Sequence, residues 1–502
     1  MQIQAKQTPV NPLVTDALLV GVFADAPPAG AVAALDETLG GAIASLSQDL
    51  PFKAELGESE TLFRPAGIKA KRLIVVGLGK KADLSSETLR KAFGGAFQSL
   101  IGTPVAQAAI LLDDLAALGW EKAAAAATEA ALLATYRYKR YVTTAKELEA
   151  HRSPEIVTLI LPKDGDLKAA QKGAEAARAI AEAANWVRDL VNTPGGDLTA
   201  TDLADEARAM AKPRGITCQV LGKQELEKQG FGALLGVNQG SVEPPAFIIL
   251  EYAGGKKKDK PIVLVGKGVT FDTGGLCIKP SKGMEEMKTD MGGGGAVMGA
   301  LRAVADLKLP LNVVGLIPAT DNMPSGTAIK PGDVLKTYNG LTLEVVDTDA
   351  EGRIILSDAL GYAAKNYDAQ AIIDLATLTG SIIVALGMHV TGMFGKDKDQ
   401  ALMDRINAAS RETGEKVWQM PTWDVYEDLV KSEIADAKNS DPRRGDAIAA
   451  AMLLGKFVGD APWVHLDIAG PSWAESPKAY YDAGATGHGV RLLVQLLRDW
   501  QV

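Results

Sequence analysis

Short apolar runs alternate with alanine-rich or amphipathic stretches along almost the whole chain. Within the first 165 residues, the apolar runs at 73–76, 108–112 and 156–161 have the length and composition of buried strands. Residues 123–135 are rich in alanine, which favours a helix between two of these strands. The pattern predicts a small α/β domain over residues 1–165.

A long alanine-rich helical pattern follows at residues 166–191, and the turn-forming run Asn192-Thr193-Pro194-Gly195-Gly196 ends it. We interpret this helix as the connection to a second domain, 192–502. There, apolar runs again alternate with helical patterns, which predicts a larger α/β domain with a mostly parallel central sheet flanked by helices. The runs are residues 246–252, 261–265, 312–317, 343–346, 371–375 and 463–466.

Composition and charge agree with two cytoplasmic domains. A chain of 502 residues, 47% hydrophobic and 23% charged, is long enough for two cores. The net charge of −9 repels polyanions, and residues 1–165 are nearly neutral, with 17 basic and 18 acidic side chains. Two distant cysteines, Cys218 and Cys277, fit a reducing compartment, and no apolar run approaches the ~18 residues of a membrane span. We therefore expect a cytoplasmic protein without a membrane segment.

Polar side chains gather where three of the predicted strands end, which is where ligands bind in open α/β sheets. Lys267 and Asp272 follow the strand that ends at Val265, and Thr377 and Thr379 follow the strand that ends at Leu375. The densest group, Asp347, Asp349, Glu351 and Arg353, follows the strand that ends at Val346. These residues predict a site at one edge of the second domain.

The charges of this site favour two metal ions. Four carboxylates, those of Asp272, Asp290, Asp349 and Glu351, would balance two divalent cations, whereas one cation would leave an excess of negative charge. Lys267 can join the ligands only as a neutral amine, a form that adjacent dications favour by lowering the lysine pKa. Lys279 can keep its charge.

Simpler interpretations exist for several of these features. An Asp-x-Glu-x-Arg segment also occurs in solvated loops and salt-bridged turns, and glycine runs such as 292–295 serve a tight turn or close helix packing. Cys277 is better explained as a buried, inert thiol than as a ligand. The turn at 75–80 lacks the full signature of a phosphate loop. The aromatic and basic run 136–141 resembles single-strand nucleic-acid binders, but it is better explained as the edge of an amphipathic helix. His465 we interpret as structural.

Several runs together resemble the leucyl aminopeptidase (cytosol aminopeptidase) family. They are VGKGVTFDTGG (265–275), IKPS (278–281), MKTDMGG (287–293), TDAEGR (348–353), DLATLTG (374–380), IAD (434–436), HLDIAG (465–470) and GATG (484–487). The likeness covers nearly everything after the connecting helix, whereas the first domain matches loosely. Asp347 stands where the family commonly has asparagine, and Ile354 where it commonly has leucine.

The resemblance implies a metal-dependent aminopeptidase whose second domain is catalytic. It implies that Asp272 and Glu351 bridge two metals, that Lys267 and Asp290 bind one of them and that Asp349 binds the other. Lys279 and Arg353 are the implied catalytic pair, with bicarbonate held by the arginine. The first substrate residue, leucine or another apolar one, is expected near Met287, Thr377, Leu378 and Gly380.

The resemblance also implies cofactors and partners. The cofactors are two Mn²⁺ or Zn²⁺ ions per subunit, with Co²⁺ as a further candidate. The partners are peptides with a free N-terminus and further copies of the chain, in a homo-hexamer built as a dimer of trimers.

Two rival functions are a dinuclear phosphoesterase and a secondary DNA-binding regulatory role of the first domain. More histidine ligands are expected for the phosphoesterase, and the near-neutral charge of residues 1–165 disfavours DNA binding.

Overall fold

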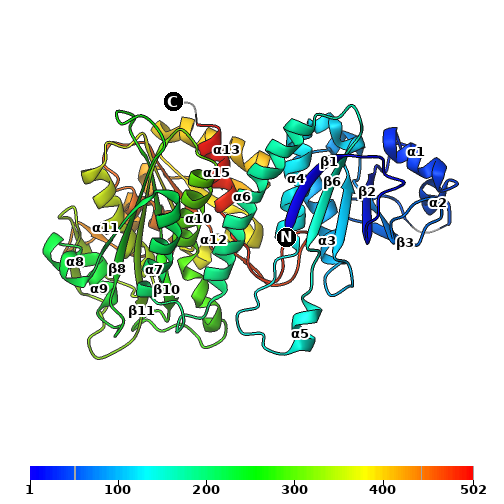
Figure 1. The fold of residues 1–502 in the computed structure, drawn as a ribbon. Helices are drawn as coiled ribbons and strands as arrows, with labels where there is room; N and C mark the ends of the chain where they lie inside the picture. Colours follow the sequence, from blue (N-terminus) through cyan, green and yellow to red (C-terminus); the bar gives the residue numbers. More distant parts are fainter. Residues whose placement is uncertain (50–51, 442–443, 501–502) are drawn as a thin grey trace. The chain divides into compact units, whose positions relative to one another are not determined.

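The structure, a computed structural model, describes residues 1–49, 52–441 and 444–500, which divide into two compact units. Unit 1 comprises Met1–Glu182 and Glu475–Ala483, and unit 2 comprises Ala183–Ala474 and Gly484–Val502. The helix predicted over 166–191 is present as α6 (Leu167–Asn192), and the division between the units falls inside it. Both units have α/β folds (Figure 1).

Unit 1 is built on a six-stranded sheet in the order β1-β6-β5-β2-β4-β3, with all neighbours parallel except β3 and β4. Its strands are β1 (Gln2–Gln7), β2 (Ala17–Val22), β3 (Ser59–Phe63), β4 (Arg72–Gly77), β5 (Gln107–Leu111) and β6 (Ile156–Leu161). Its helices before α6 are α1 (Gly30–Thr38), α2 (Ala42–Asp49), α3 (Ser86–Gln98), α4 (Trp120–Ala134) and α5 (Ala145–Ala150). The three strands predicted for this part of the chain are therefore confirmed as β4, β5 and β6.

A segment that is distant in sequence completes unit 1. Glu475–Ala483 lies between two short strands of unit 2, β19 (Trp473–Ala474) and β20 (Gly484–Ala485), yet it packs with unit 1. The Tyr480 side chain is 3% exposed, and its hydroxyl donates to the Glu87 carboxylate of α3 at 3.1 Å. Gly94 makes this packing possible, because a Cβ there would lie 2.6 Å from the Tyr480 Cβ.

Two cations of the run 136–141, Arg137 and Lys139, are partly buried and bonded within unit 1. Arg137 pairs with Asp482 at 3.2 Å, and Lys139 Nζ donates to the His151 carbonyl at 2.7 Å. Both side chains are partly withdrawn from solvent, and this burial lowers the pKa of each. DNA binding by this unit stays a prediction. Because Arg137 and Lys139 are bonded within the unit, they offer less accessible positive charge for it than the sequence pattern indicates.

The central sheet of unit 2 runs in the order β16-β15-β18-β14-β9-β11-β8-β7, with β10 also paired to β11. The centre of the sheet is parallel and consists of β18, β14, β9, β11 and β10. Antiparallel pairs flank it, namely β15 with β18, β8 with β11 and β7 with β8. The strands are β7 (Thr217–Leu221), β8 (Ala246–Ala253), β9 (Ile262–Gly266), β10 (Gly268–Asp272), β11 (Asn312–Asn322), β14 (Ala371–Ala376), β15 (Thr391–Phe394), β16 (Val417–Gln419) and β18 (Trp463–Asp467). The predicted mostly parallel core is confirmed.

Helices cover both faces of this sheet (Figure 1). One layer contains α9 and α11, and the other contains α7, α10 and α15. The helices of unit 2 are α7 (Ala200–Ala211), α8 (Lys223–Gln229), α9 (Gly232–Asn238), α10 (Gly292–Asp306), α11 (Glu351–Asn366), α12 (Gly380–Leu386), α13 (Gln400–Thr413), α14 (Asp446–Leu454) and α15 (Val490–Arg498). No helix within the described parts of the chain is long and apolar enough to cross a bilayer.

One predicted strand belongs to a different sheet from the one expected. The run 343–346 forms only the short strand β13 (Thr342–Glu344), which pairs with β12 (Val334–Lys336) and β17 (Ala437–Lys438) in a separate three-stranded sheet. The placement of this strand in the central sheet was wrong, because hydrophobicity marks a buried strand without identifying its neighbours. Asp349 and Glu351 therefore reach the site from a loop and the start of α11.

Candidate metal centre

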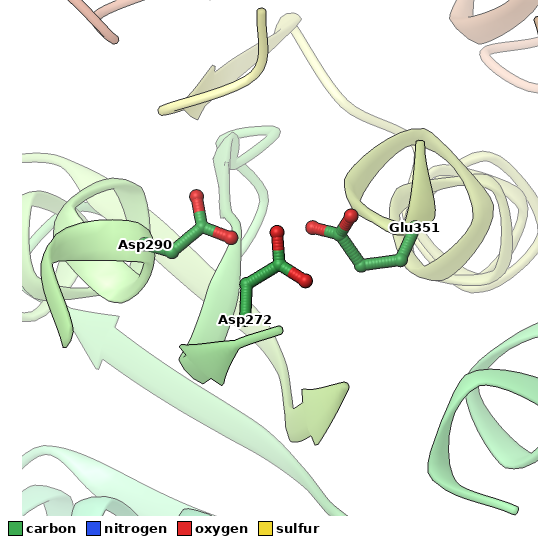
Figure 2. Close-up of side chains that lie close together, drawn as sticks. All are labelled: Asp272, Asp290 and Glu351. Atoms are coloured by element: carbon green, nitrogen blue, oxygen red, sulfur yellow. The ribbon is translucent and has the colours of Figure 1, made fainter. Parts of the chain in front are cut away.

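Three buried carboxylates converge beyond the carboxyl ends of the parallel strands. Asp272 is the last residue of β10, Asp290 lies in the 3-10 helix η4 (Met284–Met291) that leads into α10, and Glu351 is the first residue of α11. Figure 2 shows the three side chains pointing toward one another, and one oxygen of each lies within 4.8 Å of the others. They are at most 5% exposed. Carboxylates this close in a buried site require a cation.

Lys267 lies among these carboxylates. Its Nζ is 2.7 Å from Asp290 Oδ2 and 2.7 Å from Glu351 Oε1, and it also donates to the Thr377 carbonyl at 3.1 Å. Burial alone would lower the pKa of Lys267, but Asp290, Glu351 and Asp272 outweigh burial and raise it above its ordinary value. Lys267 is therefore an ammonium ion in the metal-free protein, and it has to lose a proton before it can bind a metal.

Lys279 balances the negative charge of Asp272 and Asp349. Its Nζ lies 2.7 Å from Asp272 Oδ2 and 2.5 Å from Asp349 Oδ1. The Lys279 side chain is 21% exposed and that of Asp349 is 34% exposed, so this pair forms the open side of the site. Burial opposes the charge of Lys279, but Asp272, Glu351 and Asp290 outweigh it and raise the lysine pKa.

The pKa values of the four carboxylates are raised above their ordinary values, chiefly by burial. Burial raises the pKa of Asp272, Asp290 and Asp349, and it raises the pKa of Glu351 to about 7. Asp290 Oδ2, Asp349 Oδ1 and Glu351 Oε1 are buried, and each lies beside a lysine ammonium. Four carboxylates and an amine that can lose its proton fit a pair of divalent cations.

Glycines let the backbone approach this cluster closely. Gly352 follows Glu351, and a Cβ there would lie 2.7 Å from Lys267 Cε and 2.8 Å from Leu378 Cδ1. Gly293 at the start of α10 is equally constrained, because a Cβ would lie 2.1 Å from the Leu375 carbonyl oxygen of β14. Close helix packing, one of the two interpretations of the run 292–295, is therefore observed at Gly293.

Hydrogen bonds from neighbouring side chains fix two of the carboxylates. Asn322 at the end of β11 donates from Nδ2 to Asp272 Oδ1 at 2.8 Å, and the Thr377 hydroxyl donates to Asp290 Oδ1 at 2.8 Å. Asp467, the last residue of β18, accepts from the Leu378 amide and the Thr379 hydroxyl, which holds the segment after β14 in place. The sequence gives Asn322 and Asp467 no local signal of a role, although both stand at the end of a central strand.

The residues expected to bind the first substrate residue are distributed around the cluster. Thr377 contacts Asp290, and the Leu378 side chain lies close to Gly352. Met287 is half-buried on η4, and Gly380 is the exposed first residue of α12. Among the described residues, no hydrogen bond or ion pair joins Met287 or Gly380 to the carboxylates, so their role stays a prediction.

Arg353 lies in the first turn of α11, buried at 2% exposure. Its Nη1 donates to the Asn439 carbonyl at 3.0 Å, and its Nη2 lies 2.8 Å from Asp446 Oδ1. His465, interpreted as structural, is fully buried, and its Nδ1 lies 2.6 Å from Asp374 Oδ1 in the centre of the sheet. Cys277 is a free thiol.

Fold and site together define a class of α/β protein with a buried carboxylate and lysine centre at the carboxyl edge of a parallel sheet. Comparison with known proteins identifies the family. The model of the cytosol aminopeptidase family catalytic domain matches residues 185–494, and the model of the N-terminal domain of that family matches residues 19–145. The chain belongs to the cytosol aminopeptidase family, which supports aminopeptidase activity.

Curated relatives and solved structures agree with this assignment. The chain is 45% identical over 491 residues to a probable cytosol aminopeptidase of Geobacter sp. (strain M21), covering 97% of this chain and 98% of the relative. It is 48% identical over 442 residues to a probable cytosol aminopeptidase of Roseiflexus castenholzii, covering 88% and 89%. A mutant of tomato leucine aminopeptidase has the same fold, with a TM-score of 0.88, 32% identity and coverage of 99% and 96%. The bottromycin maturation enzyme BotP in complex with Mn matches with a TM-score of 0.84, 33% identity and coverage of 97% and 99%.

Proposed function

We propose that this chain is a two-metal aminopeptidase that releases N-terminal residues from peptides, with leucine and other apolar residues favoured. The observation that carries the proposal is the buried cluster of Asp272, Asp290 and Glu351 around Lys267. Family membership and the Mn complex of BotP support it. The proposed cofactors are two Mn²⁺ or Zn²⁺ ions, with Co²⁺ as a further candidate.

Each residue of the cluster has a proposed task. Asp272 and Glu351, at the centre, would bridge the two ions, Lys267 and Asp290 would complete one site, and Asp349 on the open side would complete the other. When bound, the cations would polarise the scissile carbonyl and activate the attacking water. Asp290 would also receive a hydrogen bond from the substrate's α-amine, which restricts cleavage to the N-terminal residue.

Two cationic side chains would act on the reacting groups. Lys279 lies on the open side of the cluster and keeps its charge, so its ammonium can stabilise the oxyanion that forms during attack. Arg353 offers a planar guanidinium suited to a planar anion such as bicarbonate, which would carry the proton. The first residue of the peptide would lie near Met287, Thr377, Leu378 and Gly380.

The decisive experiment measures hydrolysis of leucyl-p-nitroanilide with Mn²⁺. Wild-type enzyme should be active, should lose turnover after chelation and should regain it with Mn²⁺. Lys279→Ala and Arg353→Ala should each lower kcat by about 100-fold or more while both metals remain bound. Lys282→Ala, an exposed lysine of the same loop, is the matched control and should retain full activity. Activity that survives complete metal removal would refute the proposal.

Substrate comparison separates the proposal from the phosphoesterase alternative. The α-amine requirement predicts that N-acetyl-leucyl-p-nitroanilide and p-nitrophenyl phosphate are not cleaved. Among the described residues, the buried cluster contains carboxylates and no histidine, a set of ligands that favours the peptidase. Phosphoester turnover above that of the leucyl substrate would favour the alternative.

We further propose a cytoplasmic homo-hexamer built as a dimer of trimers. The family description supports the cytoplasmic location. Exposed apolar side chains of unit 2 support an oligomer: Trp418 and Trp423 are each 64% exposed and Val384 is 89% exposed in the single chain. Sedimentation at micromolar concentration should give a mass of about six chains. A monomer under those conditions would contradict this part of the proposal.

A further inference from the structure

A buried asparagine that sequence analysis did not identify lies behind the metal centre. Asn439 is 0% exposed and directly follows β17. Its main-chain N–H donates to the Glu344 carbonyl at 2.9 Å, which extends the parallel pairing of β17 with β13 by one residue. Asn439 therefore lies where the chain leaves β13 and enters the loop that carries Asp349.

The Asn439 side chain uses its full hydrogen-bonding capacity on that loop. Oδ1 accepts from the Val346 amide at 2.7 Å and from the Asp347 amide at 3.3 Å. Nδ2 donates to the Asp347 carbonyl at 2.5 Å and to the Ala350 carbonyl at 3.3 Å. An asparagine side chain has two donors and one oxygen with two lone pairs, so one residue fixes the backbone on both sides of Asp349.

The backbone of the same residue holds the catalytic arginine. The Asn439 carbonyl accepts from Arg353 Nη1 at 3.0 Å, and Arg353 is buried. Asn439 thus contacts the loop of one proposed metal ligand with its side chain and Arg353 with its main chain. Within the described residues, it makes no hydrogen bond to Lys267 or Asp290, the ligands proposed for the other metal.

We infer that Asn439 is a positioning residue that sets the affinity of one of the two metal sites, the one that Asp349 completes. The inference rests on the proposed function for its assignment of ligands to the two sites. The physical reason is that groups behind a metal ligand fix its orientation, and their loss typically costs 10–100-fold in metal affinity. Because the side-chain hydrogen bonds of Asn439 go to the loop around Asp349, the loss should fall on one site.

The test is a Mn²⁺ titration of the metal-stripped full chain by calorimetry. In Asn439→Ala, one of two binding steps should weaken by about 10–100-fold, and the other should change by less than about threefold. The matched control is Asn238→Ala, since Asn238 is also buried in unit 2 and its side chain bonds Glu243 and Thr320 away from the cluster. The control should lower thermal stability without changing either step by more than about threefold.

A second variant keeps the inference testable if Asn439→Ala does not fold, and a second measurement checks the titration if it does. Asn439→Asp keeps an acceptor for the Val346 and Asp347 amides, but it sets an oxygen against the Asp347 and Ala350 carbonyls in place of the donors, so the same step should weaken. Hydrogen exchange of the Val346 and Asp347 amides should speed up in Asn439→Ala and remain slow in Asn439→Asp. Equal weakening of both steps, or no weakening in either variant, overturns the inference.

The two proposals can fail separately. If wild-type chain binds two Mn²⁺ ions but cleaves no aminoacyl substrate, the proposed function fails, while the titration still decides the role of Asn439. If wild-type enzyme is active and Asn439→Ala binds both ions normally, only the inference about Asn439 fails.

Discussion

Asp358 connects the helix that carries Glu351 and Arg353 to the rest of unit 2, and its removal should be costly. It lies on α11 with 0% exposure. Oδ2 accepts from the Leu234 amide of α9 at 2.9 Å, and Oδ1 accepts from the Tyr338 amide at 2.7 Å. Asp358→Ala leaves at least these two buried donors without a partner, which should destabilise the fold by on the order of 4 kcal/mol.

The same carboxyl group makes stability depend on pH in a defined direction. Burial raises the pKa of Asp358 to about 7, despite the opposing hydrogen bonds from the backbone. The folded protein therefore binds this proton more tightly than the unfolded chain does. The stabilising contribution is fully present below the ordinary aspartate pKa and is lost as the pH rises to about 7. Between pH 5 and pH 7 the loss should be about 2 kcal/mol.

Urea denaturation of wild-type chain and Asp358→Asn at pH 5, 6 and 7 measures this effect. The asparagine variant cannot titrate at this position, so subtracting its free energy of unfolding removes the contribution of all other groups. The advantage of the wild type should shrink as the pH rises across this range. A constant difference, or one that grows with pH, would refute the reasoning that burial dominates at Asp358.

Two further predictions concern groups beside the metal ligands. Thr377→Val removes the hydroxyl that donates to Asp290 Oδ1 and should weaken Mn²⁺ binding by about 10-fold or more, measured by calorimetry; unchanged binding would contradict that role. Asp347→Asn keeps the oxygen that accepts from the Asp349 amide at 2.9 Å but removes a negative charge, so Mn²⁺ affinity should fall by less than about tenfold, and the difference should shrink in high salt. Tighter binding by Asp347→Asn would show that the charge does not attract the cations.

The sequence predicted the parts of the fold and site that depend on local patterns. Apolar runs mark the central strands, and the rule that ligands bind beyond strand ends places Lys267, Asp272 and Thr377 at one edge of the sheet. The charge count of the carboxylates indicates two cations, and that number stays a prediction. The positions of these residues depend on neighbours along the chain, which a single sequence displays.

The parts that were missed depend on contacts between distant segments. Asp358 bonds an amide 124 residues away, Asn322 reaches Asp272 across 50 residues, and Asn439 acts on a loop 89 to 93 residues earlier. A lone polar residue in a mostly apolar helix or after a two-residue strand gives no local signal of such a partner. The short strand β13 was assigned to the wrong sheet for the same reason, since its pairing partners are β12 and β17.

The packing of Glu475–Ala483 with unit 1 has a consequence for protein engineering. A cut within α6 would give an N-terminal fragment without Tyr480, leaving Glu87 and the surface above Gly94 uncovered. The complementary C-terminal fragment would retain Glu475–Ala483 without the surface of unit 1 on which this segment packs. A chimera that exchanges the N-terminal unit between relatives should therefore take the segment Glu475–Ala483 and α3 from the same parent.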